Sequence, residues 1–286
     1  MPLNAPTSDA LPRGRVALIT GANTGIGQVT ARELAARGAQ VFVACRSAER
    51  AQAALATIRP ADGTPPPEAI ALDLGDFASV RRCAQAFLAR GLPLHLLINN
   101  AGLAGARGMT ASGFELAFGT NHMGHFLLTQ LLLDRLRASA PARVVTVASR
   151  AHKRTRGIDW QAVRQATATR SGFPEYAVSK LANVLFSAEL GRRLAGSGVT
   201  TYALHPGVVA SDIWRRVPWP LRALMKLTMI TPEEGARTTL HCATSPALSA
   251  ATGLYYDRCE AVEPTGAGRD SALAQELWQR SEGWLR

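Results

Sequence analysis

A short apolar segment followed by a glycine-rich turn constrains the fold of this chain more than any other feature. Residues 16–19 are apolar at every position, as expected of a parallel strand covered on both faces. Residues 20–27 then read TGANTGIG and lead into a predicted helix that ends at Gly38. Glycines let a backbone turn tightly and approach a pyrophosphate, whose charge the helix N-terminus attracts.

The glycine spacing in this turn is wider than the GxGxxG of other dinucleotide folds. An ordinary glycine-rich connection between a strand and a helix is therefore the alternative interpretation. We nevertheless predict a dinucleotide site here. Its expected contacts in the turn are Gly21, Asn23, Thr24, Gly25, Ile26 and Gly27.

The alternation of strand and helix continues along the chain. Further apolar segments predict strands at residues 40–45, 69–72, 94–98, 144–148, 200–204 and 253–256. Helical patterns include residues 47–59, 272–280, and 231–243, which begins with a Thr-Pro-Glu-Glu capping pattern. A chain of 286 residues that is 47% hydrophobic can bury one large core, and no linker divides it. We therefore predict a loose arm at residues 1–14 and a single α/β domain at residues 15–286.

The end of the second predicted strand favours NADP(H) over NAD(H). An acidic side chain at this place would accept a hydrogen bond from the adenosine ribose 2′-hydroxyl of NAD. Here Cys45 and Arg46 occupy it, and the planar fork of an arginine suits a 2′-phosphate. Glu49 nearby keeps NAD(H) as an alternative, and an ion pair between Arg46 and Glu49 is the other interpretation.

Small and polar residues follow the next two predicted strands. They are Asp73 and Leu74 after residues 69–72, and Asn100, Ala101 and Gly102 after residues 94–98. An open α/β sheet binds its ligands in the crevice at the carboxyl ends of the strands. We expect these residues to line the cofactor crevice, with the carboxylate of Asp73 accepting from the adenine amine.

Tyr176 and Lys180 are one helical turn apart, so their polar ends can reach the same spot. A free phenol has a pKa near ~10 and exchanges protons poorly at neutral pH. A neighbouring ammonium favours the phenolate, so we expect Lys180 to lower the pKa of Tyr176. A tyrosine tuned in this way can exchange a proton with an alcohol or carbonyl oxygen. Chance spacing on a helix is the alternative.

Three segments, in this order, resemble the short-chain dehydrogenase/reductase family. They are TGANTGIG at residues 20–27, NNAG at 99–102 and YAVSK at 176–180. The resemblance implies an α/β, Rossmann-like, doubly wound fold with a mainly parallel, seven-stranded sheet and helices on both faces. It also implies hydride transfer between a nicotinamide and an alcohol or carbonyl carbon.

The resemblance assigns roles to matching residues. Asn121 would hold a water in the proton relay, and its alternative is an amide on a helix surface. Ser149 would hydrogen-bond the substrate oxygen while Tyr176 exchanges its proton. Lys180 would also bond the nicotinamide ribose, and the turn at Pro206 and Gly207 would contact the nicotinamide carboxamide.

Further features are similar to the retinol dehydrogenase-like branch of that family. Ser149 and Tyr176 are 27 positions apart, about twice the usual interval, and ACRS at 44–47 and NHMGHF at 121–126 also match. This branch implies NADP(H) and a small lipophilic alcohol, aldehyde or ketone, such as a retinoid. Its membrane-bound members carry an N-terminal hydrophobic anchor that is absent from residues 1–14. We therefore expect a lipophilic carbonyl other than retinol at least as much as retinol itself.

Residues 208–230 combine many apolar side chains with Arg215, Arg216, Arg222 and Lys226. An apolar, partly helical segment of this kind predicts a lid over a lipophilic pocket, which would exclude water from the hydride step. A basic amphipathic segment can also contact an anionic membrane, so peripheral membrane contact is compatible with the lid.

The formal net charge of +11 is carried almost wholly by arginines. Without a long basic segment or an RNA-binding motif, scattered arginines on solvated surfaces are favoured over nucleic-acid binding. No apolar segment is long enough to span a membrane, and the four separated cysteines favour a reducing, cytoplasmic location.

Two smaller questions concern metals and partners. His122 and His125 lack a further acidic or thiol ligand in the pattern, so we expect packing residues and no metal. By analogy with relatives, a homo-oligomer could form through the helix that carries Tyr176.

A non-catalytic NADP(H)-binding regulatory protein is the alternative function, although such a protein needs neither the tyrosine nor the lysine.

Overall fold

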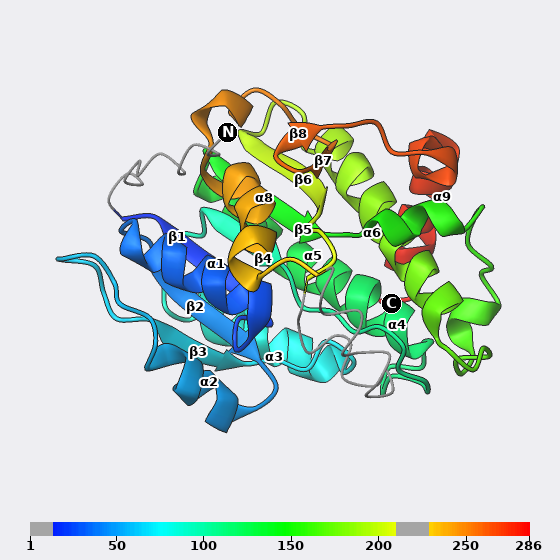
Figure 1. Ribbon diagram of the computed structural model, residues 1–286, viewed down its shortest axis with the longest axis horizontal. Coiled ribbons are helices and arrows are strands. Elements are labelled where there is room, and N and C mark those ends of the chain that lie inside the picture. Colours follow the sequence, from blue (N-terminus) through cyan, green and yellow to red (C-terminus); the bar gives the residue numbers. More distant parts are fainter. Residues whose placement is uncertain (1–13, 210–228) are drawn as a thin grey trace.

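The computed structural model describes residues 14–209 and 229–286, and its centre is an eight-stranded sheet (Figure 1). The strands are β1 (Val16–Thr20), β2 (Gln40–Cys45), β3 (Glu68–Ala71), β4 (Leu96–Asn99), β5 (Ala142–Val147), β6 (Val199–His205), β7 (Leu254–Asp257) and β8 (Glu260–Ala261). Their order is β3-β2-β1-β4-β5-β6-β7-β8, and all neighbouring pairs are parallel except β7 and β8. The predicted mainly parallel, Rossmann-like fold is confirmed.

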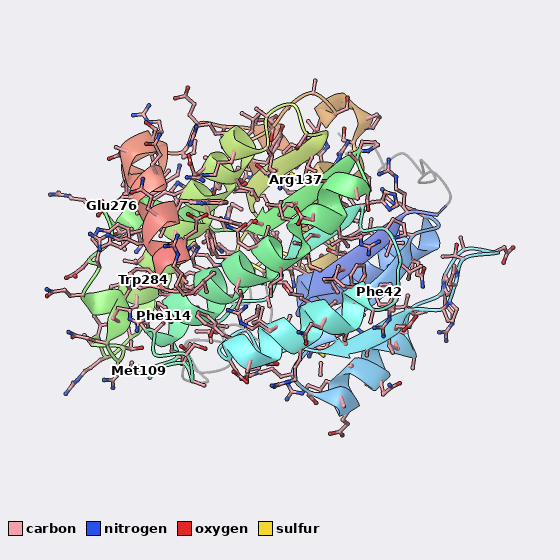
Figure 2. All side chains as sticks on the ribbon, turned by 180° about the vertical axis from the view of Figure 1, so that it is seen from behind. Phe42, Met109, Phe114, Arg137, Glu276 and Trp284 are labelled. Atoms are coloured by element: carbon pink, nitrogen blue, oxygen red, sulfur yellow. The ribbon has the colours of Figure 1, made fainter. Side chains whose placement is uncertain are left out.

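Helices cover both faces of this sheet. They are α1 (Gly25–Ala36), α2 (Ala48–Leu55), α3 (Phe77–Leu88), α4 (Leu116–Phe118), α5 (Gly124–Ala138), α6 (Phe173–Arg193), α8 (Pro232–Thr244) and α9 (Ser271–Gly283). In Figure 1, α1 and α8 lie in front of the sheet. Figure 2 shows the opposite face, covered by α3 in cyan and α5 and α6 in green, with α9 in red beside α6.

Successive side chains of the central strands enter two separate cores, because the side chains of a strand alternate between the two faces of a sheet. Leu18 of β1 packs in a cluster with Phe87 of α3 and Leu128 of α5. Its neighbour Ile19 packs in the other cluster, with Leu34 of α1 and Ala236 of α8. All six side chains are essentially excluded from solvent. Burial on both faces explains why the strands are continuous apolar segments.

The strand order reverses between β1 and β4. From β1 the chain moves outward to β2 and β3, then returns to β4 on the other side of β1 and continues to β7. The helices that follow β1 and β4 therefore leave on opposite faces and open a crevice at the carboxyl ends of these strands. Residues 20–27 and 99–102, the two family motifs that contain glycine, begin at this crevice.

The strand β8 is a correction to the predicted count of seven. It contains two residues and pairs with β7 across a two-residue turn, Arg258 and Cys259, with φ of 54° and 66°. Such turns usually carry Asn-Gly or Asp-Gly, because both central residues need positive φ. Neither an apolar segment nor a turn pattern marked this strand in the sequence.

The predicted helix at residues 47–59 is also shorter than expected. Helix α2 ends at Leu55, because the N–H groups of Thr57 and Ile58 bond three residues back, to Ala54 and Leu55. The Thr57 hydroxyl adds a bond to the Ala54 carbonyl oxygen at 2.7 Å. By contrast, the predicted capping pattern of α8 is confirmed, with Thr231 and Glu234 bonding each other's backbone N–H groups.

Most of the predicted lid at 208–230, and the predicted arm except Gly14, lie outside the described residues. At the borders of the lid segment, Val209 and Ile230 form an isolated parallel bridge. Within residues 14–209 and 229–286, no helix is both long and apolar enough to cross a membrane.

Candidate active site

The turn between β1 and α1 forms an open backbone cradle. Gly21 and Gly25 have φ of 66° and 55°, which glycine adopts readily. Gly27 must lack a side chain for a different reason: a Cβ there would lie 2.6 Å from the Gly21 carbonyl oxygen and against the Asn100 amide. That amide is fixed, since its Nδ2 donates to the Thr20 carbonyl oxygen at 2.8 Å. A narrow backbone cradle at a helix N-terminus fits a pyrophosphate.

Thr20 and His125 join this cradle to Asn121 through contacts that the sequence did not predict. The Thr20 hydroxyl accepts from the N–H groups of Asn100 and Ala101, each at 2.9 Å, and lies 2.8 Å from His125 Nε2. His125 Nδ1 lies 2.9 Å from the Asn121 carbonyl oxygen. Since a carbonyl oxygen only accepts, Nδ1 carries the proton and Nε2 accepts from Thr20. Burial lowers the pKa of His125 to about 4, so the ring is neutral at physiological pH.

Asn121 lies in the π-helical turn η1 (Gly119–Met123) between α4 and α5 and is fully buried. Its Nδ2 donates to the Leu103 carbonyl oxygen at 3.0 Å and to Ser179 Oγ at 2.9 Å. Its Oδ1 accepts from the Leu103 N–H at 2.9 Å. The surface-amide interpretation is therefore wrong: Asn121 fixes the loop after β4 against α6, directly behind the crevice wall.

His122 and His125 are both buried within the protein. His122 Nε2 lies 3.1 Å from Ser281 Oγ of α9, and burial lowers its pKa to about 3. Its ring also packs against Phe126 and Phe186. Among the described residues, no group of three or more histidine, cysteine or acidic side chains could hold a metal ion.

Ser149, Tyr176 and Lys180 come together where β5 and α6 meet. Ser149 follows β5, and its side chain lies close enough to the Tyr176 hydroxyl to lower the pKa of the phenol. The Lys180 Nζ donates to the Val147 carbonyl oxygen at 2.8 Å and lies 5.7 Å from the centroid of the Tyr176 ring. Gly102 lies beside this ammonium, since a Cβ there would be 3.5 Å from Nζ, an ordinary van der Waals contact. Tyr176 and Lys180, which are one helical turn apart on α6, therefore share one site with Ser149.

The pKa of Tyr176 does not shift in the direction expected from the sequence. Burial raises the pKa of this phenol, and the hydrogen bond from Ser149 opposes that rise. Burial also lowers the pKa of Lys180 to about 7. Because the lysine is then only partly charged at neutral pH, the desolvation of the phenolate outweighs its attraction to the ammonium.

A single cleft of about 560 Å³ connects the cradle to the Ser149, Tyr176 and Lys180 group. Every residue predicted for the site lines this cleft except Asn121, which lies behind its wall. The predicted lining residues are Gly21, Asn23, Thr24, Gly25, Ile26, Gly27, Arg46, Asp73, Leu74, Asn100, Ala101, Gly102, Ser149, Tyr176, Lys180, Pro206 and Gly207. The volume falls in the range of a site for small molecules.

Other lining residues were not predicted. Near the end of β2 they include Ser47 and Arg50, and beside Tyr176 they include Arg154 and Phe173. Arg50 is four residues after Arg46, and this helical spacing could have revealed it. Arg154 and Phe173 are far apart in sequence, so only the packing of the segment after Ser149 on α6 reveals them.

The side chain of Arg46, which we predicted to select NADP(H), is exposed. Arg46 lies at the end of β2 and lines the cleft. Within the described part of the chain, Arg46 forms no ion pair with Glu49, so that alternative is not observed. The Asp73 carboxylate accepts from the Gly75 N–H at 2.9 Å, which leaves its second oxygen available to the cleft.

A dinucleotide cradle at the switch point of the sheet, in one cleft with a serine, a tyrosine and a lysine, defines a Rossmann-like, dinucleotide-dependent oxidoreductase. The family model described as short chain dehydrogenase matches residues 15–219. The chain belongs to the short chain dehydrogenase family, as its motifs predicted.

Individual relatives agree with this assignment. Retinol dehydrogenase 12 of Homo sapiens is 46% identical over 278 residues, covering 96% of this chain and 87% of that protein. The crystal structure of a protein from Mycobacterium paratuberculosis gives a TM-score of 0.78 at 36% identity and covers 98% of this chain and 97% of the other. The complex of Pseudomonas aeruginosa RhlG with NADP gives a TM-score of 0.68 at 26% identity and covers 93% and 99%. The predicted retinol dehydrogenase-like branch is confirmed.

Proposed function

We propose that the protein is an NADP(H)-dependent oxidoreductase that interconverts a lipophilic alcohol and its aldehyde or ketone, with Tyr176 as the proton donor and acceptor. The observation that carries this proposal is that Ser149, Tyr176 and Lys180 line the same cleft as the dinucleotide cradle. The family assignment supports hydride transfer as the class of reaction.

The residues present fit a phosphorylated dinucleotide. The Gly21–Gly27 turn packs this closely against Asn100 only because Gly27 has no Cβ, and its backbone at the N-terminus of α1 suits a pyrophosphate. Arg46 lines the same cleft with its guanidinium free of carboxylate partners within the described residues, as recognition of a 2′-phosphate requires. Arg50, in the first turn of α2, adds a second positive charge to the lining of the cleft. A bound nicotinamide would supply or accept the hydride.

The protein's own residues move and orient the proton. In reduction Tyr176 gives its hydroxyl proton to the substrate oxygen, and in oxidation the phenolate takes it back. Ser149 donates to the same oxygen and so positions the reacting group between two hydroxyls. Lys180 is held beside the tyrosine by Val147, and Asn121 fixes the loop that faces it. The raised pKa of Tyr176 keeps the phenol protonated at neutral pH, the state that reduction needs.

The walls around Tyr176 support a lipophilic substrate. Ala104, Ala151 and Phe173 pack with Tyr176 in one apolar cluster, and Ala106 also lines the cleft. Small alanines leave width for a bulky or long substrate, and apolar walls favour its transfer from water. The similarity to a retinol dehydrogenase supports retinoids as candidate substrates, together with other lipophilic carbonyls.

A non-catalytic NADP(H)-binding regulator is a weaker alternative. Such a protein would need the cradle and Arg46, but no selection would keep a phenol, a hydroxyl and an ammonium assembled next to it. The lid, a homo-oligomer and a cytoplasmic location stay predictions.

A substrate and cofactor screen tests the proposal. Purified protein would be assayed with NADPH and with NADH against retinal, steroid ketones, quinones and aliphatic aldehydes. We expect turnover with at least one lipophilic carbonyl, at higher kcat/KM with NADPH. If NADPH binds but none of these compounds is turned over in either direction, the regulatory alternative replaces the oxidoreductase.

A further inference from the structure

Two arginines of the 3₁₀ helix η2 (Arg150–Arg154) line the cleft, but only one of them is neutralised. The Arg150 Nε donates to Asp257 Oδ2 at 2.5 Å. The Arg154 side chain forms no hydrogen bond and no ion pair within residues 14–209 and 229–286. One cation of the pair therefore faces the cleft without a counter-charge in the described structure.

Arg154 is nevertheless held at a defined place. Its guanidinium carbon lies 5.5 Å from the centroid of the Phe173 ring, a cation–π distance. The Phe173 ring in turn lies 5.7 Å from the Tyr176 ring. All three side chains line the same cleft. A substrate whose carbonyl carbon lies at Tyr176 could therefore extend along the Phe173 ring to the Arg154 guanidinium.

We propose that Arg154 binds an anionic oxygen group, a carboxylate, on the substrate, so that the preferred substrates are oxo or hydroxy acids with an apolar body. The inference rests on the proposed oxidoreductase function and adds the substrate class. A guanidinium stacked on an aromatic ring keeps its N–H edges free, and its planar fork matches the two oxygens of a carboxylate. A purely apolar wall would suffice for a neutral lipid, and Arg154 interrupts that wall.

The surroundings raise the local positive potential. The segments around Arg107 and Arg170 lie side by side, since a Cβ on Gly172 would be 2.9 Å from the Ala106 carbonyl oxygen. Both arginines are exposed, and neither forms a hydrogen bond or ion pair among the described residues. The nearby Glu175 carboxylate accepts from Thr169 and from the Ala168 N–H, which lower its pKa, so it stays ionised and offsets one of these positive charges. Such a field increases the local concentration of an anionic substrate.

The test compares ω-oxo fatty acids of increasing chain length with their neutral methyl esters, using full-length protein and NADPH. The measured quantity is the ratio of kcat/KM for each acid to that for its ester. For the wild-type protein we expect a preference for the acid of about five- to tenfold at low salt, as for one charge-assisted contact at a partly exposed site. The preference should appear in KM and should shrink as salt is added.

Three variants locate the effect. In Arg154→Gln the ratio of acid to ester should fall toward one, and Arg154→Lys should recover part of it because the charge returns without the fork. Lys153→Gln is the matched control: Lys153 is the exposed neighbour of Arg154 on η2 and does not line the cleft. An equal preference in Arg154→Gln and wild type, or no preference in wild type, overturns the inference. Arg154 would then only pack on Phe173.

A binding measurement separates this inference from the proposed function. A saturated fatty acid and its methyl ester, neither of them reducible, would be titrated calorimetrically into wild type and Arg154→Gln in the presence of NADP. Tighter binding of the acid that Arg154→Gln abolishes supports the site even if no aldehyde is turned over. If aldehydes are turned over but the acid binds wild type no more tightly than its ester, the carboxylate site is wrong and the oxidoreductase stands.

Discussion

The substitution Gly27→Ala should damage the cofactor cradle without touching any reacting group. The new methyl group would lie 2.6 Å from the Gly21 carbonyl oxygen and 3.0 Å from the Ala22 Cα, and it would also contact the Asn100 amide. Two of these neighbours are backbone, and Asn100 is fixed by its bond to Thr20. The first turn of α1 must therefore move away from β4. Overpacking of this kind costs about 1–3 kcal/mol.

If the turn must return to its wild-type conformation to bind NADPH, the cost of overpacking is subtracted from the free energy of NADPH binding. A tenfold change corresponds to about 1.4 kcal/mol, so NADPH should bind about five- to a hundredfold more weakly. Fluorescence titration with NADPH measures this directly, and a thermal melt should show a lower Tm. Gly283→Ala, at the end of α9, is the control, since a Cβ there meets no atom within 4 Å. Wild-type affinity and Tm in Gly27→Ala would refute the argument from close approach.

Three further predictions concern cofactor choice, the buried histidine and pH. Arg46→Ala should weaken NADPH by about tenfold and leave NADH nearly unchanged, because one charge-assisted contact is lost; equal losses in KM for both cofactors would exclude the 2′-phosphate role. His125→Phe should destabilise the protein to urea by about 1–3 kcal/mol and weaken NADPH binding, because Thr20 loses its bond to His125. His122→Phe should leave NADPH affinity intact, because among the described residues the His122 side chain hydrogen-bonds Ser281 of α9 and no residue of the cradle. Because burial raises the pKa of Tyr176, the rate of carbonyl reduction should stay constant through neutral pH and decline only above pH ~10. The rate of alcohol oxidation, which needs the phenolate, should rise with pH. A reduction rate that already falls between neutral and mildly alkaline pH would contradict a raised pKa of Tyr176.

Local patterns predicted most of the fold and the cradle. Strands buried on both faces, such as Val16–Thr20, must be apolar at every position, and the turn after them must be rich in glycine, so both are visible in the sequence. The strand β8 was invisible because its two exposed residues bury nothing, and because Arg258 and Cys259 are unusual at positive φ.

Contacts between distant segments and the effects of burial could not be predicted. Thr20 and His125 are 105 residues apart, and no local pattern pairs them. The spacing of Tyr176 and Lys180 located both side chains but not their desolvation, which reverses the expected pKa shift of the tyrosine. No local sequence pattern distinguishes Arg154 from the other arginines, and only its position over Phe173 connects it with the cleft.

The central claim is that the Tyr176 hydroxyl carries the proton in the reaction. The most direct measurement is the turnover number of Tyr176→Phe with NADPH and an accepted aldehyde, beside a titration of NADPH binding. Tyr255→Phe is the matched control, because the Tyr255 hydroxyl is buried nearby without a hydrogen-bond partner in the described residues. We expect Tyr176→Phe to lose about 10²–10⁴-fold in kcat, as loss of a general acid implies, and still to bind NADPH. A Tyr176→Phe protein with a kcat close to that of Tyr255→Phe would contradict the claim.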